Sequence, residues 1–266
     1  MKSDGLHIET IGTGEDVVLV HGWGMHSGFW REFARHLAAS YRVSCIDLPG
    51  HGRSQMIEDF NLSSVVDKLM ETVPRRAHWI GWSLGASMVL KMACMSPDRV
   101  QSATMIAGNP KFSNSVDWTV GLDISVLNEF HTNLKNDFEG TLLRFLKHQT
   151  HGMDRSNLVY KVMKMRLTEC GIPRSDALAC GVEILKTADL RGCMGNLRLP
   201  LMVILGAKDP LVPVGVATEM ERLNPMAQIR VIAQAGHIPF VSHSAQILDY
   251  VQGFLNDIEY GDYAKN

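Results

Sequence analysis

The chain has 266 residues, of which 45% are hydrophobic and 20% charged, and its formal net charge is −2 at pH 7. This composition excludes a disordered or collagen-like chain and argues against a nucleic-acid-binding domain. No apolar run approaches the roughly 18 residues of a transmembrane helix, and the first residues lack the basic and apolar regions of a secretory signal. We therefore expect a cytoplasmic protein without nucleic-acid or membrane partners, folded as one large or two small domains.

The cysteines are odd in number and widely spaced, which bears on both disulfides and metals. No CxxC pair and no Cys/His metal spacing occurs among them, so we expect reduced, mostly buried thiols and no metal site. The five positions are Cys45, Cys94, Cys170, Cys180 and Cys193.

Apolar runs without alternation, typical of strands buried on both faces of a parallel sheet, recur along the chain. They cover residues 17–20, 43–48, 77–81, 100–108, 201–206 and 228–233. Helical patterns lie between them, at 28–39, 62–73, 84–95, 214–223 and 245–255. This alternation predicts the α/β class, with a mostly parallel sheet flanked by helices on both faces.

One long segment breaks the alternation. Residues 112–186 contain no convincing strand, and Phe138, Leu142, Phe145 and Leu146 share one face of a predicted helix. We expect residues 1–111 and 187–266 to form the core, with residues 112–186 inserted as a helical cap.

The segment GWSLG, from Gly81 to Gly85, is the most specific local signal. It follows a predicted strand and opens a predicted helix, which is the context of a nucleophile elbow. In such a turn the serine hydroxyl projects above the sheet, and the helix N-terminus favours developing negative charge. Ser83 is therefore the predicted nucleophile.

A serine nucleophile needs a base, and the base needs an orienting carboxylate. Asp209 follows the predicted strand 201–206, and His237 follows the predicted strand 228–233. Both positions are at the carboxyl ends of strands, where ligand sites of open α/β sheets form. The chain order Ser, Asp, His predicts a triad of Ser83, Asp209 and His237.

Acyl transfer also needs donors for a tetrahedral oxyanion. The backbone N–H of Leu84, directly after the serine, is one predicted donor. The loop HGWG after the first predicted strand offers the other, and we assign it to the backbone N–H of Trp23.

The motifs HGWG (21–24), DLPGHGRS (47–54), GWSLG, GAKDPLVP (206–213) and AGHIPFVSH (235–243) together resemble the α/β-hydrolase superfamily. With RFLKHQT (144–150) and GVEILKTADLR (181–191), the chain more narrowly resembles the BioH family, the pimeloyl-acyl-carrier-protein methyl ester esterases of biotin synthesis. The resemblance implies the same three catalytic residues and no cofactor. It also implies substrate-binding residues: Trp23, Ser83, Leu84, Phe145, Leu146, Lys147, His148, Gln149 and His237. Lys147 and His148 depart from the smaller or apolar residues expected there.

The charge of the cap is consistent with an acidic partner. Between Gly140 and Arg174 there are seven basic and two acidic residues, a local charge of +5 on a chain of −2. A basic surface can steer an acyl carrier protein toward the pocket, and an amphipathic helix with a solvated charged face is the alternative. The predicted docking residues are Arg144, Arg155 and Lys161.

The sequence thus predicts a monomeric serine carboxylesterase that hydrolyses the methyl ester of pimeloyl-acyl-carrier protein and also accepts small esters. Two alternatives use the same triad, a broad short-chain carboxylesterase and a C–C bond hydrolase. A third is a non-catalytic binding protein of the same fold. Dehalogenases and related epoxide hydrolases are disfavoured because they carry Asp at the elbow, where this chain has Ser83.

Overall fold

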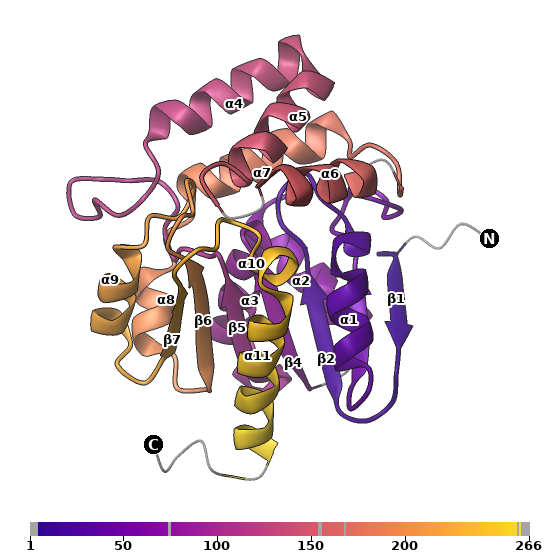
Figure 1. Cartoon of the computed structure of the whole chain (residues 1–266), viewed down its shortest axis with the longest axis vertical. Coiled ribbons are helices and arrows are strands. Elements are labelled where there is room, and N and C mark those ends of the chain that lie inside the picture. Colours follow the sequence, from indigo (N-terminus) through magenta and orange to yellow (C-terminus); the bar gives the residue numbers. More distant parts are fainter. Residues whose placement is uncertain (1–4, 74–75, 154–155, 168, 260, 262–266) are drawn as a thin grey trace.

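Seven strands form one sheet in the computed structural model, which describes residues 5–73, 76–153, 156–167, 169–259 and 261 (Figure 1). The strand order is β1-β3-β2-β4-β5-β6-β7. β1 pairs antiparallel with β3, and every other neighbouring pair is parallel. The strands are β1 (Ile8–Ile11), β2 (Asp16–Val20), β3 (Arg42–Ile46), β4 (Ala77–Trp82), β5 (Val100–Ile106), β6 (Leu201–Gly206) and β7 (Gln228–Ile232). The predicted α/β class with a mostly parallel sheet is confirmed.

Helices cover both faces of this sheet. α1 and α11 lie on one face, and α2, α3 and α8 lie on the other (Figure 1). The core helices are α1 (Arg31–Leu37), α2 (Leu62–Thr72), α3 (Leu84–Met95), α8 (Arg191–Asn196), α9 (Val216–Leu223), α10 (Pro239–Ser242) and α11 (Ser244–Glu259), with 3-10 turns at Ser27–Trp30 and Pro97–Arg99. The first predicted helix, 28–39, is therefore divided between a 3-10 turn and α1.

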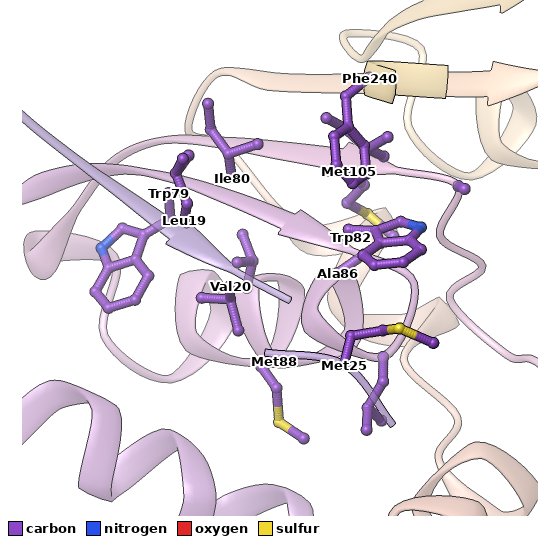
Figure 2. Close-up of a cluster of buried hydrophobic side chains, with 14 of the residues drawn as sticks. Leu19, Val20, Met25, Trp79, Ile80, Trp82, Ala86, Met88, Met105 and Phe240 are labelled. Carbon is purple, nitrogen blue, oxygen red and sulfur yellow. The ribbon is translucent and has the colours of Figure 1, made fainter. Parts of the chain in front are cut away.

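The central strands are buried on both faces, as their unbroken apolar runs predict. All residues of β4 and β6 are buried. Figure 2 shows the side chains of this core, with Leu19 and Val20 of β2, Ile80 of β4 and Met88 of α3 among those drawn. Fully burying one such aliphatic side chain stabilises the fold by roughly 1.5–3 kcal/mol, so this layer holds the strand ends in place.

Between β5 and β6 the chain forms a group of helices that packs above one end of the sheet before it returns through α8 (Figure 1). The helices of this group are α4 (Ile124–Asn136), α5 (Phe138–Gln149), α6 (Ser156–Leu167) and α7 (Ser175–Thr187). The side chains of Asp123 and Asp137 accept hydrogen bonds from the first turns of α4 and α5, which fixes where these helices begin. We call residues 112–186 the cap segment. Leu142, Phe145 and Leu146 of α5 are buried, as the helical spacing predicts.

The sequence patterns missed several short elements, among them β1, α8 and α10. β1 is a short edge strand with mostly exposed side chains, so no apolar run announces it. α8 has only six residues and two glycines, too short for a helical period to appear. Within the described part of the chain, no helix is both long and apolar enough to cross a membrane.

Candidate active site

Ser83 lies between β4 and α3 in a conformation rare for any residue but glycine, with φ 55° and ψ −117°. Such a backbone persists only where its surroundings enforce it. A side chain at Gly81 would collide with the carbonyl of Gly85, and one at Gly85 would lie 2.6 Å from the carbonyl oxygen of His21. The two glycines therefore allow α3 to start directly against β2 and β4, and the turn lifts Ser83 out of the sheet.

A chain of two hydrogen bonds joins Ser83, His237 and Asp209. His237 Nε2 lies 2.8 Å from Ser83 Oγ, and His237 Nδ1 lies 2.8 Å from Asp209 Oδ2. All three residues are buried, and the side chain of Asp209 is 0% exposed. With the Nδ1 proton on the carboxylate side, Nε2 is left to accept the hydroxyl proton of Ser83. The structure thus brings together all three residues of the predicted triad.

Separate contacts hold the two loops that carry His237 and Asp209. Trp82 Nε1 donates to the carbonyl oxygen of His237 at 2.8 Å. The backbone N–H groups of Leu211 and Val212 donate to Asp209 Oδ1 at 2.8 and 3.0 Å. One carboxylate oxygen is therefore fixed by the backbone while the other faces the imidazole.

The two predicted oxyanion donors flank Ser83. Leu84 is the first residue of α3, so its N–H has no partner within the helix. The loop after β2 runs against the serine, because a side chain at Gly22 would lie 3.2 Å from Ser83 Cβ. Trp23 follows in this loop, and among the described residues its backbone N–H donates to no protein acceptor. Both groups are available to a developing negative charge beside Ser83.

His21 shapes the same loop, a role that the sequence analysis did not assign. Its Nε2 accepts from the backbone N–H of Leu48 at 2.9 Å, so Nδ1 carries the proton and donates to the carbonyl oxygen of Gly22 at 2.8 Å. Burial lowers the pKa of His21 to about 3, which keeps the ring neutral. The HGWG motif was the available signal, but sequence could not show that Leu48 supplies the other contact.

Asp47 ties the two neighbouring loops together. Its carboxylate accepts from the backbone N–H of Ser27 at 2.6 Å and from that of Arg53 at 2.9 Å. Burial alone would raise the pKa of the Asp47 carboxyl, but His21 and these hydrogen bonds hold it below its usual value. The carboxylate therefore remains charged and keeps the loop after β2 packed against the segment 47–54.

A narrow apolar cavity of only about 20 Å³ lies at Ser83, between the core and the cap segment. This volume is far below that of a small-molecule site, so the cavity is nearly closed in this structure. Its lining residues are Trp23, Ser83, Phe112, Leu122, Leu127, Phe130, Phe145, Val182, Leu185 and Leu211. The site therefore suits an apolar chain that ends at the serine hydroxyl.

Trp23 connects the cavity wall to the cap segment. Its ring packs edge-on against the ring of Phe145 in α5, with the ring centres 4.7 Å apart. Its Nε1 donates to the carbonyl oxygen of Leu178 in α7 at 2.9 Å. A side chain at Gly181 would lie 2.7 Å from the Trp23 ring. One residue therefore supplies a backbone donor to the site and a side chain that positions α5 and α7.

The residues of the predicted substrate segment 145–149 differ in burial and in what they contact. Phe145 lines the cavity, and Leu146 is buried. Lys147 and His148 are exposed. The carbonyl of Gln149 accepts from the His237 N–H at 3.4 Å, so this residue touches the catalytic loop. Direct substrate contacts by the last four residues stay a prediction.

Most of the cavity wall was missed from sequence. Phe130, Val182 and Leu185 sit on amphipathic helices, where an apolar residue that faces a cavity looks the same as one that faces the core. Only the packing of α4, α5 and α7 decides which of them reaches Ser83.

Two of the predicted docking residues, Arg144 and Lys161, are exposed on the cap segment. Arg144 is exposed on α5 and pairs with Asp137 at 2.9 Å. Lys161 lies on α6 and, with Lys164, lines a groove whose other walls include Leu142 and Met165. Arg155 lies outside the described residues.

Comparison with known proteins places this site in a family. A family model described as the alpha/beta hydrolase fold matches residues 17–244. A protein of Methylococcus capsulatus (strain Bath), named pimeloyl-[acyl-carrier protein] methyl ester esterase, is 39% identical over 94% of this chain and 98% of its own. A protein of Aliivibrio fischeri (strain ES114) with the same name is 36% identical over 94% of this chain and 97% of its own.

The chain belongs to the α/β-hydrolase family. The relatives show that it belongs, within that family, to the group of the pimeloyl-[acyl-carrier protein] methyl ester esterases, so the narrower resemblance is confirmed as well. Among solved structures, an esterase from Exiguobacterium antarcticum matches this α/β hydrolase with a TM-score of 0.85 at 17% identity, over 94% of this chain and 95% of its own. The enol-lactonase from Burkholderia xenovorans LB400 matches with a TM-score of 0.81 at 19% identity, over 94% of this chain and 96% of its own. These two likenesses show the shared fold alone.

Proposed function

We propose that this α/β hydrolase is a cytoplasmic, monomeric serine esterase that hydrolyses the methyl ester of a pimeloyl group carried on acyl carrier protein, a step of biotin synthesis. The hydrogen-bonded chain Ser83–His237–Asp209, opening on an apolar cavity, is the observation that carries the reaction class. The names of the relatives supply the substrate.

The first half of the reaction forms an acyl-enzyme. Ser83 Oγ attacks the ester carbonyl carbon while His237 Nε2 takes the hydroxyl proton. Asp209 stabilises the imidazolium, and the N–H groups of Trp23 and Leu84 stabilise the tetrahedral oxyanion. His237 then gives its proton to the departing methoxide, and methanol leaves.

The second half releases the acid. His237 takes a proton from water, the resulting hydroxide attacks the acyl-enzyme carbonyl, and the proton returns to Ser83 Oγ as the ester bond breaks. The product carries a new carboxylate inside an apolar cavity. Because burying an unpaired charge is costly, this carboxylate favours product release.

The cap segment supports both ends of the substrate. The methylenes of the pimeloyl group pack against Trp23 and the aromatic rings of Phe130 and Phe145, after the nearly closed cavity widens to admit them. We further propose that residues 112–186 act as a lid unit whose outer basic residues, Lys161 among them, dock the acidic carrier. Removal of the methyl ester needs no metal or organic cofactor in this scheme.

A labelling and turnover experiment tests the proposal. Wild-type protein treated with a fluorophosphonate should lose activity and carry one adduct, mapped by mass spectrometry to Ser83. Ser83→Ala should take up no label and should lower kcat for methyl ester hydrolysis by about 10⁵–10⁶-fold with an unchanged melting temperature. Substantial methanol release by Ser83→Ala, or a label on another residue, would place the nucleophile elsewhere.

A further inference from the structure

Three side chains with metal-binding atoms meet at the end of the sheet opposite to Ser83. Glu15 precedes β2, His78 lies near the start of β4, and Glu259 is the last residue of α11. One ligand atom from each of them lies within 4.8 Å of the others. Ser83 follows His78 by five residues along an extended strand, so the two sites are about 16 Å apart. Figure 1 shows the cap helices at the top of the molecule and the end of α11 at the bottom.

His78 is the central group of this cluster. Its side chain is 0% exposed, and its Nδ1 lies 2.7 Å from the hydroxyl oxygen of Ser102 on β5. Its Nε2 faces Glu15 Oε2 at 3.5 Å, beyond hydrogen-bond distance, and has no hydrogen-bond partner among the described residues. A buried imidazole held at one nitrogen by a hydrogen bond, with its other nitrogen facing carboxylates, can present that nitrogen to a metal ion.

The charges around His78 favour a bound cation. Glu15 and Glu259 place two carboxylates beside the ring, and Arg76 also lies near it. Gln101 Nε2 donates to Glu15 Oε2 at 2.8 Å, which orients that carboxylate toward the histidine.

We propose that Glu15, His78 and Glu259 bind a divalent transition-metal ion, with zinc as the preferred one. Two ligands about 2.1 Å from a tetrahedral zinc ion are about 3.4 Å apart, close to the 3.5 Å between His78 Nε2 and Glu15 Oε2. The two glutamates are exposed, so small rotations of their side chains complete the geometry. One nitrogen and two carboxylate ligands suit zinc better than calcium, which takes oxygen ligands alone.

The site has a structural consequence. A bound ion would join the end of α11 to the starts of β2 and β4, three segments that are far apart in sequence. Because the ion binds the folded chain and not the dispersed ligands, it would raise the melting temperature. The distance to Ser83 predicts that ester hydrolysis does not depend on it.

The test uses tag-free, full-length protein freed of metal with a chelator and then titrated with zinc chloride. We expect calorimetry to show one zinc ion per chain, the melting temperature to rise, and hydrolysis of p-nitrophenyl acetate to stay unchanged. Glu15→Gln and Glu259→Gln should each weaken zinc binding by about tenfold or more. Glu221→Gln, which removes the same charge from the exposed surface of α9, should bind zinc as the wild type does.

The two ligand variants change exposed positions, so the test does not depend on whether a His78 variant folds. The proposal is overturned if the folded wild type binds no zinc at micromolar concentrations. It is equally overturned if Glu15→Gln and Glu259→Gln bind as tightly as the wild type, or if Glu221→Gln weakens binding as much as they do. Zinc inhibition of ester hydrolysis that persists in Glu259→Gln would locate the ion at Ser83 instead.

Discussion

His21 and His51 are two fully buried imidazoles behind the loop that carries Trp23, with ring centres 5.3 Å apart. His21 holds the carbonyl of Gly22, and His51 Nδ1 lies 2.9 Å from the carbonyl oxygen of Pro49. Burial lowers the pKa of His51 to about 4 and that of His21 to about 3. Both rings are therefore neutral in the folded protein at the pH at which the esterase is expected to work.

These depressed pKa values predict acid sensitivity. Between pH 6.5 and about 4, both histidines are protonated in the unfolded chain and stay neutral in the folded chain. The free energy of unfolding therefore falls as the pH falls. At pH 5 each histidine should cost about 2 kcal/mol, and the melting temperature should be roughly 5–10 °C lower than at pH 7. Thermal denaturation followed by circular dichroism over this range measures the effect.

A histidine variant with a matched control assigns this slope. His51→Gln keeps a neutral donor for the carbonyl of Pro49. It should reduce the loss of stability between pH 7 and pH 5 by the contribution of one histidine. His36→Gln changes an exposed histidine on α1 and should leave the slope as it is. If both variants follow the wild-type curve, the acid sensitivity does not come from the buried rings.

At the scale of elements, the contact between α3 and the end of β2 fixes the position of Ser83. Gly85 is in the first turn of α3, and a side chain there would lie 2.6 Å from the carbonyl oxygen of His21. The residue that permits this close approach is thus as important to the site as the residues that react.

Gly85→Ala should therefore damage stability and catalysis together. The methyl group must push α3 away from β2, which we expect to cost on the order of 3 kcal/mol and to lower kcat strongly. Gly253→Ala is the control, because this exposed glycine of α11 has open space at its Cβ position. It should gain roughly 0.5–1 kcal/mol from helix propensity alone. Urea denaturation and ester turnover measure both effects, and a Gly85→Ala protein as stable and active as wild type would contradict this account of the elbow.

Strands that are buried on both faces could be predicted from the sequence. An exposed edge strand, and a cavity wall that several helices build together, could not. The central strands and Ser83, Asp209 and His237 were accessible because strand ends in a parallel sheet converge whatever the rest of the chain does. β1 was missed because its partner β3 supplies its hydrogen bonds while solvent covers its side chains. The cavity wall was missed because it depends on how α4, α5 and α7 pack, which a helical period does not encode.

At the scale of the whole molecule, residues 140–174 carry a net charge of +5, and the excess of acidic residues lies in the rest of the chain, including the remainder of the cap segment. Lys161 is exposed on α6 beside the groove between α5 and α6. Arg144 is the weaker probe of carrier docking, because its guanidinium already pairs with Asp137. Long-range attraction of an acidic carrier would act mainly on the rate of association and would weaken with salt.

Lys161→Glu should lower kcat/KM for the carrier-linked ester by about three- to thirtyfold, since each such contact is worth roughly 0.5–2 kcal/mol. Hydrolysis of p-nitrophenyl acetate should stay near the wild-type rate, because Ser83 and its partners lie on the core. Arg198→Glu makes the same charge change at an exposed position outside the cap segment and serves as the control. Equal losses in both variants, or losses on both substrates, would count against docking at Lys161.

The central claim, a carrier-dependent methyl esterase built on Ser83, is tested most directly by one comparison of kcat/KM. Pimeloyl methyl ester is offered to the wild-type protein both free and attached to acyl carrier protein, and methanol release is measured at low and high salt. We expect the carrier-linked ester to react faster by at least about tenfold at low salt, with the advantage shrinking as salt is added and with Ser83→Ala inactive on both. Equal rates on the free and the carried ester at every salt concentration would contradict the claim and identify a broad carboxylesterase instead.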